Sequence, residues 1–215
     1  MTIINFISLI EVFTFTSLFV FFSNFIIKFI NKYRIEKNFV IILFSIKVIF
    51  FLIMFFYGKV GYSADSKSIY DMSTIFFDKI YNNLSYRNFF GSDFLSIIIS
   101  PITNFGKLSY FNTSLLFLLL GFYASLLFYI VLRKNSQNRY QRILSVIIIL
   151  YPTLNLYTSY ITKDLLIFFF LSYFLFIINF EFKKKYFNYK LIFIVIGILL
   201  IRPYIFIILS ISTLI

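Results

Sequence analysis

The sequence contains no cysteine, no histidine and no tryptophan among its 215 residues. Without cysteine, the chain can form neither disulfide bonds nor thiolate metal sites. Without histidine, it lacks both the commonest metal ligand and the base of a serine–histidine nucleophile pair. Any acid–base chemistry therefore falls to eight carboxylates, the lysines and 17 tyrosines. We expect neither a metal nor any other cofactor.

Charge is also scarce, since 13% of the residues are charged, compared with about 25% in soluble proteins. Hydrophobic residues make up 61% of the chain, which indicates that the bilayer is its solvent. Because a membrane-crossing helix needs about 20 apolar residues, we expect an all-α, polytopic helix bundle that forms a single membrane domain over residues 1–215. The six predicted spans cover residues 5–30, 39–57, 112–132, 143–157, 165–180 and 191–214.

Two of these runs have irregular ends. Pro152 is expected to break the fourth span, because proline has no N–H to donate within a helix. The last run stops at Ile215 without a polar tail, which is typical of a fragment of a longer protein.

Positive charge is concentrated in three clusters of four residues. They are Lys28, Lys32, Arg34 and Lys37, then Arg133, Lys134, Arg139 and Arg142, and finally Lys183, Lys184, Lys185 and Lys190. Loops rich in lysine and arginine remain on the cytoplasmic side. This rule predicts a multi-pass protein of the cytoplasmic (inner) membrane, with the N-terminus and residues 58–111 outside. The clusters then account for the net charge of +12 as topology signals and lipid-headgroup contacts, so we expect membrane lipid and no nucleic acid as partners.

The predicted outer loop, residues 58–111, contains two structured segments. Apolar residues recur at helical spacing at Ile69, Met72, Phe76 and Ile80. This spacing predicts an amphipathic helix over residues 68–82 that lies on the membrane surface. Residues 94–111 are apolar but interrupted by Pro101 and Gly106, which indicates a re-entrant or interfacial segment.

Asp65 is a candidate catalytic carboxylate. It lies between the second predicted span and the predicted surface helix, where it could act as a general base at the outer membrane boundary. The alternative is a helix-capping or solvated aspartate. Tyr70, in the predicted helix, is either a supporting residue or an interface anchor. Asp71 and Asp78 are interpreted as the solvated side of that helix or as complements of its N-terminal dipole.

A second candidate site lies in the polar stretch 151–164, between the fourth and fifth predicted spans. Non-helical backbone near the membrane must be buried in protein or line a wet cavity. Thr162 is the expected N-cap of the next helix, and that helix N-terminus together with Lys163 would favour phosphate or pyrophosphate. Asp164 would complement the dipole in the first turn. The alternative is an ordinary capped helix start, with Lys163 extending to the interface.

Arg202 and Pro203 lie inside the sixth predicted span. Arg202 is 12 residues beyond the third basic cluster, which corresponds to about 18 Å into a hydrocarbon core about 30 Å thick. A charge at that depth needs a partner or a wet cavity, and Asp164, Asp65 or a substrate phosphate could supply it. A purely structural ion pair is the alternative. Lys47, in the second span, could extend to the interface or pair with a carboxylate.

Taken in chain order, these elements resemble the polytopic glycosyltransferases of bacterial envelopes. The resemblance is to GT-C-type enzymes and to the polymerases of O-antigen and exopolysaccharide assembly, and it covers roughly residues 40–205. It depends on the Gly-x-x-x-Asp-Ser-x-x-x-Tyr motif of residues 61–70, on the Pro-Thr-Leu-Asn-Leu-Tyr-Thr-Ser-x-x-x-Lys-Asp motif of residues 152–164, and on the Arg-Pro pair at 202–203. This chain departs from the GT-C pattern because its loop follows the second span rather than the first.

The resemblance implies glycosyl transfer from a polyprenyl (pyro)phosphate-linked sugar donor. In GT-C-type enzymes an aspartate of the first outer loop is the base for the acceptor hydroxyl, a role that would fall to Asp65. Basic residues at the outer face hold the donor phosphate, which would involve Arg202 and Lys163. The supporting residues would be Tyr70, Asp164 and Lys47. Two other functions stay open: a transporter or flippase subunit for a lipid-linked or anionic solute, and a non-catalytic membrane assembly partner.

Overall fold

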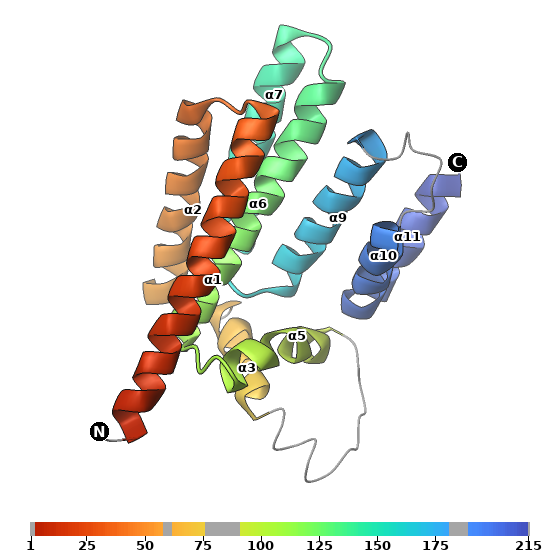
Figure 1. Ribbon diagram of the computed structural model, residues 1–215. Coiled ribbons are helices and arrows are strands. Elements are labelled where there is room, and N and C mark those ends of the chain that lie inside the picture. The colour runs from red at the N-terminus through yellow and green to blue at the C-terminus, as the bar shows by residue number, and fades with distance from the viewer. Residues whose placement is uncertain (1–2, 58–61, 76–90, 181–188, 215) are drawn as a thin grey trace.

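The computed structural model describes residues 3–57, 62–75, 91–180 and 189–214, and these ranges contain helices and no strands. The prediction of an all-α membrane helix bundle is confirmed (Figure 1). The helices are α1 (Ile3–Tyr33), α2 (Lys37–Tyr57), α3 (Tyr62–Thr74), α5 (Ser92–Asn104), α6 (Tyr110–Asn135), α7 (Arg139–Leu150), α8 (Pro152–Tyr157), α9 (Lys163–Phe180), α10 (Tyr189–Ile201) and α11 (Pro203–Leu214).

Four of the described helices, α1, α2, α6 and α9, are long and apolar enough to cross a membrane. The core is centred on α6, which contacts α1, α2, α7 and α9. In its most apolar stretch 72% of the residues are buried, compared with 6% in α1. Since both helices are apolar, this difference assigns α6 to the protein interior and the surface of α1 to lipid.

The remaining predicted spans are divided into shorter helices. Pro152 separates α7 from α8, as the sequence predicts, and Arg202 separates α10 from α11. At 12 residues for α7, 13 for α10 and 12 for α11, none of these pieces reaches the length of about 20 residues that a crossing needs. Helices α10 and α11 contact each other, and in Figure 1 α11 leads back toward the end of the molecule where α9 ends.

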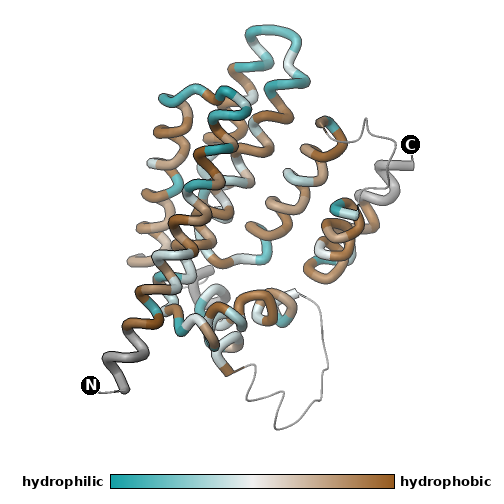
Figure 2. Tube along the Cα trace, viewed as in Figure 1, coloured by the Kyte–Doolittle hydropathy of each residue, from teal (hydrophilic) through white to brown (hydrophobic). Residues whose placement is uncertain are grey.

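The first two basic clusters lie at one end of the bundle. The first spans the connection from α1 to α2 and the second spans the connection from α6 to α7, and Figure 1 draws both at the top. Figure 2 shows hydrophilic residues gathered there, above the apolar stretches of the helices. Of the third cluster, Lys183 to Lys185 lie outside the described residues.

Helices α3 and α5 pack against each other at the opposite end of the bundle (Figure 1). The helix predicted for residues 68–82 begins earlier, at Tyr62, and its last described helical residue is Thr74. Ile69, expected on the stripe that faces the membrane surface, is instead buried inside the protein, whereas Met72 is exposed; Phe76 and Ile80 lie outside the described residues.

Pro101 does not end α5, contrary to the expected interruption, because the helix continues to Asn104. Proline at this position cannot donate to the carbonyl of Ile97. The hydroxyl of Ser100 donates to that carbonyl instead, at 2.8 Å. The freed acceptor is therefore satisfied locally, and the second expected interruption, Gly106, lies in the connection to α6.

Glu11 joins α1 to the beginning of α6. Its Oε1 accepts a hydrogen bond from the backbone N–H of Ser109 at 2.8 Å and another from the Asn112 amide at 2.7 Å. Ser109 is the N-cap of α6, and a carboxylate there complements the positive end of the helix dipole. Glu11 thus fixes the first long helix to the central one.

Candidate functional site

The beginning of α9 is capped as the sequence predicts. The Thr162 hydroxyl accepts a hydrogen bond from the backbone N–H of Leu165 at 3.0 Å and donates to the carbonyl of Tyr157 at 2.8 Å. Lys163 and Asp164 therefore occupy the first turn of a helix whose start is fixed. Backbone N–H groups in that turn carry partial positive charge, which favours an anion.

Arg202 pairs with Asp164, one of the three partners that the sequence allowed. One terminal nitrogen of the guanidinium donates to Asp164 Oδ1 and the other donates to the hydroxyl of Tyr204. The side chains of Arg202 and Asp164 are 31% and 43% exposed, respectively. Arg202 therefore lies level with the beginning of α9, in the break where α10 ends and α11 begins and the two helices pack against each other.

The beginning of α5 adjoins this ion pair. The N–H of Gly91, the N-cap of α5, donates to the carbonyl of Leu200 at 2.9 Å. A Cβ at Gly91 would lie 4.0 Å from Cδ of Lys163 and from the carbonyl oxygen of Ile201. The beginnings of α5, α9 and α11 thus meet around Lys163 and Arg202, at the end of the bundle opposite the first two basic clusters (Figure 1).

Asp65 and Tyr70 both belong to α3, which lies at this same end. The side chain of Asp65 lies outside the described part of the chain. The hydroxyl of Tyr70 donates to the carbonyl of Leu108 at 2.8 Å, and its ring packs against Tyr110. Burial raises the pKa of Tyr70, and the charges of Glu11 and Asp71 raise it further, so the hydroxyl stays a neutral donor.

The described contacts of Tyr70 are structural. None of its described contacts involves Lys163, Asp164 or Arg202. It fastens α3 to the segment that leads into α6 and does not join the charged group at the start of α9.

Lys47 neither extends to the interface nor pairs with a carboxylate in the described structure. Its side chain is 0% exposed, and Nζ donates to Oγ1 of Thr158 at 2.6 Å and to the carbonyl of Thr158 at 3.4 Å. Both acceptors belong to the residue that ends α8. The break between α8 and α9 leaves backbone oxygen atoms inside the bundle, and Lys47 supplies a donor for one of them.

Asn155 and Gly121 complete this buried polar region and were not expected as site residues. The amide of Asn155 donates to the carbonyls of Ile149 and Tyr151, at 2.8 and 3.1 Å, across the break before α8. Gly121 of α6 lies directly against Thr158, since a Cβ there would be 1.8 Å from the carbonyl oxygen of Thr158. The position of Asn155 in the polar stretch 151–164 was the available signal for it; Gly121 had none.

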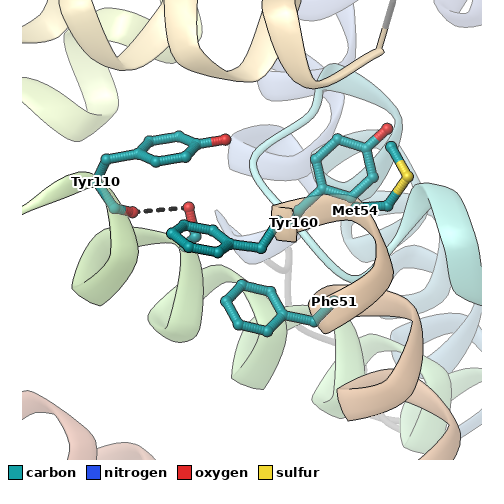
Figure 3. Close-up of a pocket in the computed structure, with 6 residues that line it drawn as sticks. Phe51, Met54, Tyr110 and Tyr160 are labelled. Atoms are coloured by element: carbon teal, nitrogen blue, oxygen red, sulfur yellow. Dashed lines mark hydrogen bonds between the residues drawn. The ribbon is translucent and has the colours of Figure 1, made fainter. Parts of the chain in front are cut away.

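A small cavity adjoins this region (Figure 3). It is lined by Phe51, Met54, Phe55, Tyr110, Ser114 and Tyr160. Its volume of about 10 Å³ is near the smallest space that holds one water molecule. The cavity is therefore too small for a sugar ring in this conformation, and the charged group at the start of α9 is the stronger candidate site.

The structure thus brings together Lys163, Asp164 and Arg202, and it separates Tyr70 and Lys47 from them. Among the residues with described positions, no group of three or more carboxylates could hold a metal ion. The sequence matches no protein-family model, and comparison with curated proteins and with solved structures finds no match either.

Proposed function

We propose that the protein is a membrane glycosyltransferase or polysaccharide polymerase that uses a polyprenyl (pyro)phosphate-linked sugar at the outer face of the cytoplasmic membrane. The observation that carries the proposal is the meeting of Lys163 and Arg202 with the beginnings of three helices at one end of the bundle. Two cations beside helix N-termini form a favourable environment for a phosphate. The basic loops at the other end favour an outward-facing site.

The reaction would need little from the protein beyond positioning and charge stabilisation. An acceptor hydroxyl attacks the anomeric carbon of the donor, a new C–O bond forms, and the bond from that carbon to the phosphate oxygen breaks. The electron pair leaves on the phosphate, where Arg202 and Lys163 would stabilise the negative charge. The hydroxyl proton would pass to Asp65 of α3.

The partners of Arg202 leave it able to bind such a group. A guanidinium has five N–H donors, and the described contacts to Asp164 and Tyr204 use one each. Asp164 holds the orientation of Arg202, and the partial exposure of both side chains gives a ligand access. The same pair would therefore orient the arginine and prevent an unpaired charge at the membrane.

Gene replacement in the native host tests the proposal. The gene is deleted and complemented with wild type, Asp65→Asn or Arg202→Lys at matched expression, and lipid-linked glycans and surface polysaccharide are profiled by mass spectrometry. We expect the deletion and both variants to accumulate an unextended, outward-facing lipid-linked precursor. Lys107→Gln is the matched control, because Lys107 is an exposed cation in the connection before α6. Unchanged glycans in the deletion strain would refute the proposal.

A transporter or flippase for a lipid-linked or anionic solute is the second candidate. The observation that favours it is the pair of interrupted helices, α7–α8 and α10–α11, because discontinuous helices also form transporter sites. Treating intact spheroplasts with a membrane-impermeant glycan-modifying enzyme before the same profiling separates the two functions, because the enzyme reaches only precursor on the outer face. A flippase would leave the precursor on the inner face in the deletion strain, whereas a transferase or polymerase would leave it on the outer face.

A further inference from the structure

We propose that Lys47 is a positioning residue for the phosphate site, through a buried bond that fixes the segment leading into α9. The identity of the ligand, a phosphate, rests on the proposed function. The effect of Lys47 on the position of the segment before α9 does not. Lys47 touches neither Lys163 nor Arg202 in the described contacts. It acts on them through Thr158, which lies four residues before the N-cap of α9.

The first step is the cost of keeping a lysine in this place. A fully buried lysine within a membrane bundle is unfavourable unless its amine is paired. Both described bonds of Lys47 go to neutral oxygen atoms of one residue, Thr158. An apolar side chain of similar length would avoid this cost, because buried ionisable groups can often be replaced by well-packed hydrophobic residues without loss of stability. Fold stability alone therefore does not explain a lysine here.

The second step is that Thr158 is held from three elements. Its hydroxyl donates to the carbonyl of Leu154 in α8 at 2.6 Å, so the same oxygen accepts from Lys47 of α2. Its carbonyl lies against Gly121 of α6, where no side chain intervenes. Thr158 thus cannot move away from α2 without losing the bond to Lys47, and it cannot move toward α6 without a steric clash.

The third step connects Thr158 to the site. The connecting residues 158–162 have little conformational freedom, because two local hydrogen bonds hold them. The hydroxyl of Thr162 donates to the carbonyl of Tyr157, and the hydroxyl of Ser159 donates to the carbonyl of Asn155. Thr162 in turn caps α9, whose first turn presents Lys163 and Asp164. A shift of Thr158 would therefore move Lys163 together with Asp164, the partner of Arg202.

The test uses the full chain in phosphatidylcholine nanodiscs, with undecaprenyl phosphate as the probe. Lys47→Met and Thr158→Val remove the buried bond from either side, and Thr158→Ser keeps the hydroxyl as the matched control. Three quantities are measured for each variant: the probe affinity, the melting temperature, and amide hydrogen exchange in residues 158–165 compared with α6.

We expect Lys47→Met to speed amide exchange in residues 158–165 and to lower the affinity for the probe by about tenfold. This factor corresponds to the free energy of about one hydrogen bond. Exchange in α6 should not become faster and the melting temperature should not fall, because the substitution replaces a buried polar amine with an apolar side chain of similar length. Thr158→Val should speed exchange in the same residues at least as much, because it also removes the bond to the Leu154 carbonyl, and the double variant should add nothing to Thr158→Val. Thr158→Ser should behave as wild type.

Two results would overturn the role of Lys47. One is exchange and probe affinity at wild-type values in Lys47→Met; the other is faster exchange in α6 together with a lower melting temperature, which would make Lys47 a purely structural residue. If wild type binds the probe no better than Arg202→Ala does, the phosphate site itself is refuted. In that case the exchange pattern still decides whether Lys47 fixes the start of α9.

Discussion

A single glycine determines how closely the break between α8 and α9 approaches the central helix. A Cβ at Gly121 would lie 1.8 Å from the carbonyl oxygen of Thr158, which is backbone and cannot rotate away. We predict that Gly121→Ala destabilises the protein by about 1–3 kcal/mol, the usual cost of overpacking. Thermal unfolding followed by circular dichroism measures this. Ser125→Ala, one turn further along α6, is the control and should cost less; an equal loss in both would argue against the clash.

The charged residues of the site could be found from the sequence, but only some of their partners could. Asp164 was among the partners expected for Arg202, because a charge placed deep in a predicted span needs an opposite charge nearby. The partner of Lys47 was not expected. A sequence shows which residues are charged, but Thr158 is 111 residues away along the chain, and its oxygen atoms become acceptors only because α8 ends there.

Helix boundaries followed the sequence where a cap or a proline controlled them. Thr162 caps α9 as predicted, and we expect Thr162→Ala to lower the free energy of unfolding by about 0.5–2 kcal/mol, the usual cost of a lost N-cap. Thr162→Ser keeps the hydroxyl and should retain most of the stability. Melting temperatures in matched detergent compare the two variants. A serine variant as unstable as the alanine variant would show that the cap bond contributes little.

Other element boundaries depended on contacts that hydropathy does not record. The described buried face of α3 consists of Ser66, Ile69 and Ser73, whereas the sequence interpretation followed the large apolar residues after Ile69. Small polar residues allow α3 to pack closely against α5, as they do between membrane helices. The hydroxyl of Ser66 accepts from Tyr110 at 3.0 Å. The helix therefore begins earlier than its apolar pattern indicates.

The class of the whole fold was predictable because it depends on composition alone. Long apolar runs separated by basic clusters require helices in a bilayer, and the structure has four described helices of crossing length. The arrangement of the shorter pieces was not predictable. The return of α11 along α10 and the packing of α3 under the bundle depend on contacts between distant segments (Figure 1).

The orientation of the bundle in the membrane is the prediction on which the proposed function depends most. The first two basic clusters lie at one end, and the Arg202–Asp164 pair lies at the other. Because basic loops remain in the cytoplasm, we expect Lys107→Cys to react with a membrane-impermeant maleimide in intact spheroplasts. Gln137→Cys should react only in inverted vesicles. Both residues are exposed and lie in connections at opposite ends of α6.

The absence of native cysteine makes these labels unambiguous, and the unsubstituted chain is the blank for both reagents. Labelling of both positions from one side would mean that α6 does not cross the membrane, contrary to its length and its buried apolar surface. The reversed pattern would leave the fold intact and turn Lys163 and Arg202 toward the cytoplasm. A donor phosphate on the outer face could not then reach them, so the labelling result decides whether this group of charges can serve the proposed reaction.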